Sequence, residues 1–124
     1  MIEKISTHKA PQAIGPYSQA IKFNNMLFTS GQIALDPETM EVVEGDVKVQ
    51  AERVMKNLQA VLEEAGANFD HVIKTTCFLA NMGDFAAFNE VYGKYITNAP
   101  ARSCVAVKEL PKNVLCEVEV IAYL

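Results

Sequence analysis

Apolar residues recur at spacings of three and four positions between residues 46 and 66. The members of this stripe are Val47, Ala51, Val54, Leu58, Val61, Leu62 and Ala65. Side chains at such spacings share one face of an α-helix, and charged residues occupy the opposite face here. Asp46 is well placed to cap the first turn, and Gly66 to end the last one. The pattern therefore predicts an amphipathic helix over this segment.

Runs of β-branched, aliphatic and aromatic residues on both sides of this helix predict strands. The predicted strands are residues 2–6, 19–23, 26–30, 71–79, 102–108 and 114–124. Asn24 and Asn25 are expected to form a hairpin turn between the second and third strands. Asn suits this place because it tolerates the positive φ that two-residue turns require.

A second helix is predicted after Asp84, its expected N-cap, and before Asn98-Ala99-Pro100. Its expected packed face consists of Phe85, Phe88, Tyr92, Tyr95 and Ile96. Strand, helix and strand over residues 71–108 predict a right-handed crossover between parallel strands. The whole order predicts an α+β fold, a mixed β-sheet with two helices packed on one face. A length of 124 residues fits a single domain, residues 1–124.

The last predicted strand carries two carboxylates on a face that is otherwise apolar. Its even positions from Val114 to Leu124 are all apolar and are expected to face the helices. Its odd positions are Leu115, Glu117, Glu119, Ile121 and Tyr123. A buried carboxylate is costly unless it is paired or protonated. Either Glu117 or Glu119 is exposed or structurally paired, or it has a raised pKa that serves chemistry.

Arg102 opens the neighbouring apolar stretch and is the natural counter-charge for such a carboxylate. As an alternative, its guanidinium could grip the carboxylate of a substrate through two parallel hydrogen bonds. Both interpretations stay open at this point. If the strand that begins at Arg102 lies at a sheet edge, away from the strand of Glu117, the two side chains meet only across an interface between subunits.

Other candidate site positions also have simpler structural explanations. Tyr17, within Gly15–Ser18, could belong to an ordinary turn, and Ser30-Gly31 could be a strand end. Asn89 could be a buried and hydrogen-bonded amide. Cys104, close to Arg102, could be a low-pKa nucleophile, but no His lies near it in sequence. A packed thiol is therefore the simpler interpretation of Cys104.

Composition narrows the class of protein. The chain has 11 Lys and Arg against 15 Asp and Glu, which disfavours binding to nucleic acids or anionic membranes. Half of the residues are apolar, and this surplus favours an oligomer. The three cysteines lack CxxC spacing and the two histidines lack ligand spacing, so we expect neither a disulfide framework nor a metal site. The N-terminus lacks a signal-peptide pattern and no apolar run suits a membrane span, so a reducing cytoplasm is the expected location.

Five segments carry a resemblance when they are taken together. They are Gly15–Ala20 (GPYSQA), Phe28–Ile33 (FTSGQI), Asp84–Tyr92 (DFAAFNEVY), Pro100–Val107 (PARSCVAV) and Glu117–Ala122 (EVEVIA). With them the chain resembles, essentially end to end, the reactive intermediate deaminase family (RidA, also called YjgF), in particular its enamine/imine deaminase branch. The Pro-Ala-Arg-Ser block followed by the Glu is the most specific signature. One departure is minor: Cys116 and Val118 flank Glu117, where members more often carry Ile or Met.

The resemblance implies a chorismate-mutase-like subunit in a homotrimer, with clefts between the subunits. The implied activity is hydrolysis of 2-imino acids such as 2-iminobutanoate and 2-iminopropanoate to 2-oxo acids and ammonia, without a cofactor. These imines arise from enamines that amino-acid dehydratases release. Arg102 would anchor the substrate carboxylate, and Glu117 would handle the water. The expected lining of the pocket is Tyr17, Ser30, Gly31, Asn89 and Cys104, the last through its backbone.

Elementary chemistry agrees with this assignment, because a 2-imino acid is already an activated electrophile. Glu117 can accept a proton from the attacking water and return one to the leaving nitrogen. An apolar strand face raises the pKa of Glu117, whereas a nearby Arg102 lowers it, and the sequence leaves the balance undecided.

The main alternative is a non-catalytic protein that binds or senses small carboxylates such as 2-oxo acids. That alternative requires Arg102 but not Glu117. Ribonuclease activity or translation inhibition, which is associated with some relatives, fits poorly with the acidic balance of the chain. The sequence leaves open the preferred side chain of the imine and any chaperone-like behaviour.

Overall fold

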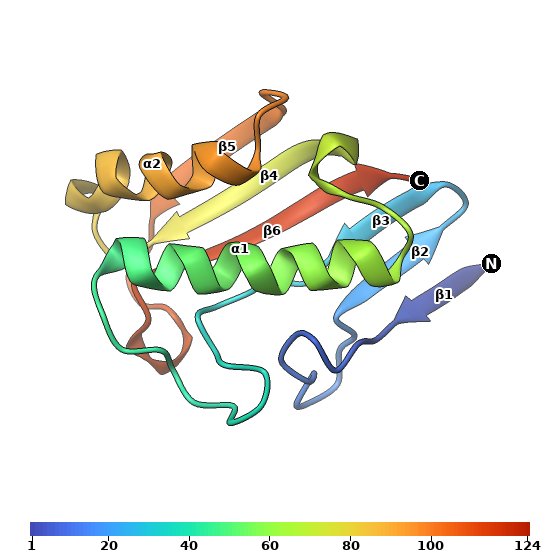
Figure 1. The fold of residues 1–124 in the computed structure, drawn as a ribbon, viewed down its shortest axis with the longest axis horizontal. Coiled ribbons are helices and arrows are strands. Elements are labelled where there is room, and N and C mark those ends of the chain that lie inside the picture. The colour runs from blue at the N-terminus through green and yellow to red at the C-terminus, as the bar shows by residue number, and fades with distance from the viewer.

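The structure, a computed structural model, describes the whole chain from Met1 to Leu124. Six strands form one sheet in the order β1-β2-β3-β6-β4-β5. The strands are β1 (Ile2–Ile5), β2 (Ala20–Phe23), β3 (Met26–Thr29), β4 (Val72–Leu79), β5 (Ala101–Ala106) and β6 (Cys116–Tyr123). Helices α1 (Val47–Glu64) and α2 (Phe85–Tyr95) lie side by side over one face of the sheet (Figure 1). Neither helix is long and apolar enough to cross a membrane.

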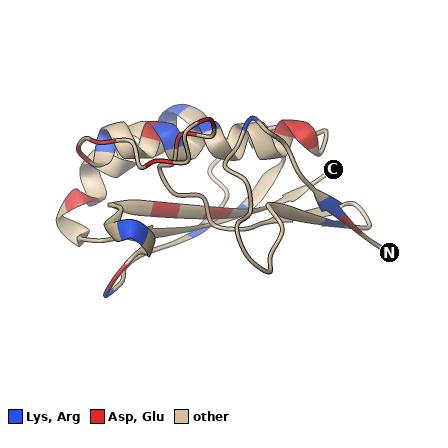
Figure 2. Cartoon of the chain, turned by 90° about the horizontal axis from the view of Figure 1, so that it is seen from below, with Lys and Arg blue, Asp and Glu red and all other residues tan.

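The molecule therefore has two layers, with both helices on the same side of the sheet (Figure 2). This arrangement confirms the predicted α+β architecture. Each strand lies within two residues of its predicted ends. The core fills the space between the layers, so the other face of the sheet is free of helices.

Strand pairing is antiparallel except between β4 and β5, which run parallel and are joined through α2. This pairing confirms that the two predicted strands over residues 71–108 run parallel on either side of a helix. Strand β5 pairs with β4 alone, so the strand that carries Arg102 is an edge strand, as expected. Strand β6 lies between β3 and β4. Consequently, β4 separates the strand of Arg102 from the strand of Glu117.

Helix α1 begins and ends where its sequence predicts. Asp46 Oδ1 accepts a hydrogen bond from the Val49 N–H at 3.0 Å. Gly66 adopts a φ of +84°, in the left-handed region that glycine enters without strain. The Ala67 N–H then donates to the Leu62 carbonyl at 2.9 Å, which satisfies one of the last carbonyls of the helix. Local signals alone therefore define both ends of this helix.

Helix α2 begins differently from the prediction. Asp84 occupies the N-cap position, but its side chain makes no capping hydrogen bond. Instead, Asn81 caps a preceding 3₁₀ turn, Met82–Asp84, by accepting a hydrogen bond from the Gly83 N–H at 2.7 Å. Because this turn runs directly into α2, the side-chain cap is needed at the start of the turn and not at Asp84.

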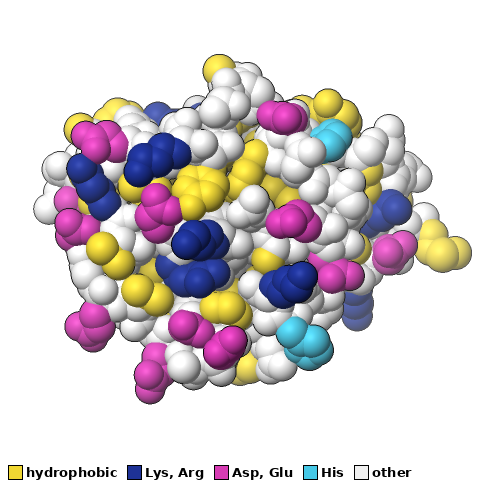
Figure 3. Space-filling view, viewed as in Figure 1, with side chains coloured by type: hydrophobic (Ala, Val, Ile, Leu, Met, Phe, Trp, Pro, Cys, Tyr) yellow, Lys and Arg dark blue, Asp and Glu magenta, His cyan; other side chains and the backbone are white.

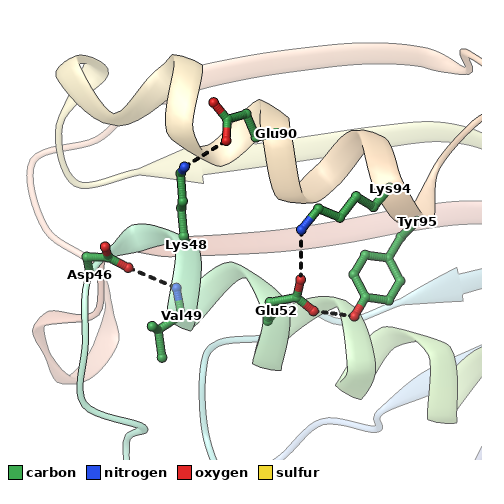
Figure 4. Close-up of polar contacts among 7 residues, drawn as sticks. All are labelled: Asp46, Lys48, Val49, Glu52, Glu90, Lys94 and Tyr95. Carbon is green, nitrogen blue, oxygen red and sulfur yellow. Dashed lines mark hydrogen bonds and ion pairs between the residues drawn. The ribbon is translucent and has the colours of Figure 1, made fainter.

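Polar contacts join the two helices on their outer surface (Figure 4). Lys48 of α1 lies 2.7 Å from the carboxylate of Glu90 on α2. One turn further along α1, Glu52 lies 3.7 Å from Lys94 Nζ and accepts a hydrogen bond from the Tyr95 hydroxyl. Exposed ion pairs add little stability, so these contacts orient α2 while the apolar core supplies most of the stabilisation.

The helix-free face of the sheet is rich in apolar side chains. The even positions of β6 are buried beneath the helices, as predicted, so its odd positions point to the other face. Phe28 is in register with Ile121, and Phe78 with Glu117, which puts these side chains on that face too. Phe28 is 42% exposed and Tyr123 is 45% exposed. Exposed apolar side chains gathered on one face are typical of surfaces that bind a partner.

Candidate active site

A cavity of about 610 Å³ lies where β3 ends and β6 begins, among the loops that adjoin these two central strands. Three segments line it, within residues 11–19, 30–40 and 111–117. Its wall includes four of the predicted site residues, Tyr17, Ser30, Gly31 and Glu117. We call these four residues the carboxylate half-site.

Glu117 is the half-buried carboxylate of this cavity wall. Its side chain packs directly over the backbone of Gly31, which has no Cβ to obstruct it. Burial, and secondly the nearby carboxylate of Glu119, raises the pKa of Glu117. Arg102 of the same chain does not contribute to this shift, so burial sets its direction within one chain. A carboxylate with a raised pKa beside a cavity is suited to proton transfer.

Ser30 and Tyr17 complete the wall from the loop side. The Ser30 hydroxyl donates to the Ser18 carbonyl at 2.5 Å, and the Ser30 N–H donates to the Gln19 carbonyl at 2.9 Å. Because its proton is already used, the Ser30 oxygen can act towards a ligand as an acceptor. The Tyr17 side chain is 53% exposed and is accessible from the cavity.

Two buried amides that the sequence analysis missed hold the loops of this cavity. Gln19 donates to the Pro11 carbonyl at 2.7 Å. Asn57, on the buried face of α1, donates to the carbonyls of Ile33 and Leu35 at 3.1 and 3.0 Å. The sequence did carry a signal for Asn57, because this amide falls three residues after Val54 on the apolar face of the predicted helix. A polar group there needs a partner, and loop carbonyls are frequent partners.

The remaining predicted site residues, Asn89, Arg102 and Cys104, form a second group, which we call the guanidinium half-site. Arg102 extends from β5 to α2, where its Nη1 donates to Asn89 Oδ1 at 2.7 Å. Its guanidinium carbon lies 4.9 Å from the ring centroid of Tyr92 and 5.4 Å from that of Phe85. Both ion pairs of the chain involve other residues. Arg102 is therefore a half-buried cation without a counter-charge in its own chain.

Cys104 lies in register with Cys77 on the adjacent parallel strand. Burial raises the pKa of the Cys104 thiol, and raises that of Cys77 to about 12. Both thiols are consequently protonated at neutral pH, which does not suit a thiolate nucleophile. The geometry favours a packed thiol at Cys104. No three His, Cys, Asp or Glu residues converge into a group that could hold a metal ion.

The two half-sites of one chain lie on opposite faces of the sheet. Arg102 is in register with Thr75, which is buried beneath the helices, whereas Glu117 is in register with Phe78 on the helix-free face. The intervening strand and about 10 Å of strand length separate them further. The interpretation of Arg102 as the counter-charge of Glu117 is therefore wrong within one chain. A site that uses both residues requires a second copy.

Comparison with known proteins adds to this geometry. The family described as endoribonuclease L-PSP matches residues 7–124. A RutC family protein of Pyrococcus abyssi is 55% identical to this chain, over 98% of the chain and 96% of that protein. Reactive Intermediate Deaminase A, chloroplastic, of Arabidopsis thaliana is 49% identical, over 98% of the chain and 66% of that protein.

Solved structures share the fold closely. RidA from an Antarctic Psychrobacter superposes with a TM-score of 0.94 at 45% identity, covering 98% of this chain and 99% of that one. TdcF of E. coli, described with bound serine, superposes with a TM-score of 0.93 at 42% identity, covering 98% of both chains. The likeness therefore spans sequence and fold together.

Proposed function

We propose that this chain, which belongs to the endoribonuclease L-PSP family, hydrolyses 2-imino acids to 2-oxo acids and ammonia. The same family includes the reactive intermediate deaminases (RidA/YjgF). Membership supports a hydrolytic deaminase of small molecules in general terms. The finer proposal names 2-iminopropanoate and 2-iminobutanoate, which form from the enamines that amino-acid dehydratases release. The observation that carries it is an uncompensated guanidinium, Arg102, together with a carboxylate of raised pKa, Glu117.

The two half-sites match the two charged groups of a protonated 2-imino acid. The substrate carboxylate would accept hydrogen bonds from Arg102 in the bidentate geometry that a guanidinium favours. The iminium nitrogen would lie towards Glu117, whose negative charge complements it. Serine, with which the related E. coli TdcF is described, carries the same two charged groups on one carbon. This likeness supports a small carboxylate with an adjacent nitrogen as the ligand class.

In the proposed reaction, Arg102 holds the substrate so that C2 faces a water beside Glu117. The water oxygen bonds to C2 as Glu117 accepts a proton, and the electron pair of the C=N bond moves to nitrogen. Glu117 then returns the proton to the nitrogen. The C–N bond breaks with its electron pair leaving on ammonia, while Glu117 accepts the hydroxyl proton as the carbonyl forms and afterwards gives that proton to the ammonia or to water. Such positioning lowers a barrier by several kcal/mol, and acid–base assistance adds a factor of ~10²–10⁴.

We further propose that the active unit is a homotrimer with sites between neighbouring subunits. The opposite placement of Arg102 and Glu117 supports shared sites, because each site takes one half from each of two chains. The apolar helix-free face supports association, since it would otherwise remain exposed to water. The family resemblance implies that three chains form the ring, whereas the geometry of one chain requires only that a second chain be present.

Imine decay tests the proposal directly. A dehydratase acting on serine or threonine generates the imine, and semicarbazide traps what remains while released ammonia is measured. We expect the imine to disappear faster with the purified protein than in buffer, without added cofactor. Equal rates would contradict the enzyme. If a 2-oxo acid still bound, the alternative of a non-catalytic carboxylate-binding protein would replace it.

A ribonuclease activity has less support, although the family description contains the word endoribonuclease. The chain has a formal charge of −4. On the helix face, Lys and Arg side chains alternate with Asp and Glu (Figure 3). A nucleic-acid surface would need a continuous basic patch or groove.

A further inference from the structure

The surroundings of Arg102 are neutral on every side that this chain builds. Helix α2 contributes the amide of Asn89 and the rings of Phe85 and Tyr92. The strands contribute the thiols of Cys77 and Cys104. A half-buried cation usually has a carboxylate partner, because an unpaired charge away from water is costly. The neutral set is therefore unusual for a residue with only a structural role.

These neighbours also stay neutral at physiological pH. Burial raises the pKa of Tyr92, raises that of Cys104, and raises that of Cys77 to about 12. The acidic residue next to Asn89 in sequence, Glu90, is held at 2.7 Å by Lys48 on the outer surface of the helices (Figure 4). Neither ion pair of the chain includes Arg102, so no carboxylate lies within ion-pair distance of it.

The same neighbours fix the orientation of the guanidinium. The Tyr92 ring supports the planar group from one side, and its hydroxyl lies 2.8 Å from the hydroxyl of Thr75. Tyr92 is 8% exposed and Thr75 is fully buried, so this ring is held firmly. Asn89 accepts one N–H at 2.7 Å, which limits rotation of the guanidinium in its plane. Besides the Asn89 amide, the only polar group that the guanidinium contacts is the neutral thiol of Cys77, so most of its N–H donors remain available to a ligand.

We infer that Asn89 and Tyr92 are positioning residues that act through Arg102: the Tyr92 face and the Asn89 amide hold the guanidinium in place, and their neutrality reserves its charge and free donors for a small monocarboxylate. For turnover this inference rests on the proposed function. For binding it stands alone, because it concerns the affinity of one cation for one anion. A carboxylate at position 89 would occupy the same N–H and neutralise the anchor from within.

The order of affinities in a position-89 series tests the role of neutrality. The probe is 2-oxobutanoate, titrated calorimetrically into the full-length protein. Asn89→Ala removes the acceptor without adding charge, and we expect affinity to fall about threefold. Asn89→Asp is nearly isosteric but supplies a competing carboxylate, and we expect a loss of about tenfold or more. A merely structural role predicts the opposite order, with Ala worse than Asp, and that result would overturn the inference.

The ring of Tyr92 is tested by two replacements. Tyr92→Phe keeps the ring face, and we expect affinity for 2-oxobutanoate to stay within about threefold of the original. Tyr92→Leu removes the face, and we expect a loss of about fivefold or more. Tyr95→Phe, on the same helix but outside the half-site, is the matched control and should leave affinity unchanged. Equal affinities for the Phe and Leu variants, both folded by circular dichroism, would contradict the inference. If Tyr92→Leu does not fold, the order at position 89 decides.

Turnover separates this inference from the proposed function. Because the carboxylate is bound equally in the ground state and the transition state, the Asn89 and Tyr92 variants should raise KM more than they lower kcat. If the protein hydrolyses no imine but the variants show the expected order of affinities, the deaminase proposal fails and the inference on Asn89 and Tyr92 stands. If imine hydrolysis is normal but the order of affinities at position 89 is reversed, the deaminase proposal stands and the inference on Asn89 and Tyr92 fails.

Discussion

A Cβ atom added at Gly31 would lie 2.0 Å from Oε2 of Glu117, which is far inside van der Waals contact. It would also lie 2.8 Å from the carboxyl carbon of that side chain. Any larger residue at position 31 must therefore displace the carboxylate. The absence of a side chain at one position thus fixes where the proposed acid–base group can be.

Gly31→Ala should lower turnover of 2-iminobutanoate about a hundredfold, since the displaced carboxylate loses its acid–base contribution. The fold should survive because the obstructed group is the end of a flexible side chain. Gly93→Ala is the matched control, because a Cβ at Gly93 has nothing within 4 Å. It should leave kcat unchanged and raise Tm slightly, since alanine suits a helix better than glycine. Unaltered turnover in Gly31→Ala would remove Glu117 from its proposed place.

Glu117→Gln should increase stability at neutral pH while it abolishes most turnover. Because the pKa of Glu117 is raised in the fold, the folded chain binds more protons than the unfolded chain between the ordinary and raised values. Stability therefore falls as pH rises through that interval. Thermal unfolding should show a higher Tm for Glu117→Gln at pH 7, and no such advantage below pH 4.5, the ordinary value.

The same variant should still bind a 2-oxo acid, because Arg102 is intact. In the unmodified protein, turnover should decline as pH falls through the raised pKa of Glu117, since only the ionised carboxylate accepts a proton from water. Near-native turnover in Glu117→Gln would favour Glu119, or simple trapping of a water, in place of Glu117.

Two inactive chains should restore activity when they are mixed and refolded. Arg102→Ala removes the carboxylate anchor, and we expect it to lose ligand binding and turnover together. Glu117→Ala removes the acid–base group. Mixed assemblies contain sites with Arg102 from one chain and Glu117 from another, so part of the activity should return.

Sedimentation and a tagged chain verify that the assemblies are mixed. Absence of any recovery in verified mixed assemblies would place both residues in sites of a single chain. A monomeric protein by sedimentation would contradict the shared site altogether.

Tyr95→Phe should make the fold less sensitive to alkali. Burial, and then the hydrogen bond to Glu52, raises the pKa of Tyr95 to about 12, against an ordinary value of 10.0. The folded chain keeps this proton over an interval in which the unfolded chain loses it, so stability falls as pH rises from 10 towards 12. We expect the Tm of the unmodified protein to drop more steeply over that range than the Tm of Tyr95→Phe.

At pH 7 the same substitution should cost about 1 kcal/mol, the usual contribution of one lost hydrogen bond. An identical pH dependence of Tm in both proteins would show that Tyr95 contributes nothing to it.

Cys104→Ser should keep appreciable deaminase activity. Burial raises the pKa of this thiol, so the proposed reaction uses no thiolate. Serine is close in size and leaves the backbone of β5 unchanged. Complete loss of imine hydrolysis, in a variant with unchanged circular dichroism and Tm, would reopen covalent chemistry at Cys104.

The parts of the fold that depend on local signals were predictable from the sequence. Helix α1 has a regular apolar stripe, an N-cap at Asp46 and a glycine at position 66, and all three agree. The start of α2 was wrong in detail, because Asp84 looked like a cap while Asn81 carries out that role in the preceding turn. Two capping residues three positions apart are hard to rank without the backbone between them.

The composition of the candidate site was harder to predict because it depends on strand order. The sequence singled out Arg102 and Glu117, but no local pattern tells on which faces of the sheet they lie relative to one another. That relation follows from the register of β5, β4 and β6. Tyr92 was predicted as part of a packed helix face, and its contact with the guanidinium follows from the crossover that brings α2 over β5.

If sites are shared between subunits, as proposed, the placement of Arg102 and Glu117 on opposite faces has a genetic consequence. In a closed ring, a chain that lacks both residues inactivates both of the sites that it shares with its neighbours. The intact half-sites that those neighbours contribute are then also without function. Activity in a mixed population then follows the square of the fraction of intact chains, whereas sites within single chains would follow the fraction itself. A cell that expresses an intact and a doubly defective allele would lose more than half of its activity, so the defective allele would be partly dominant.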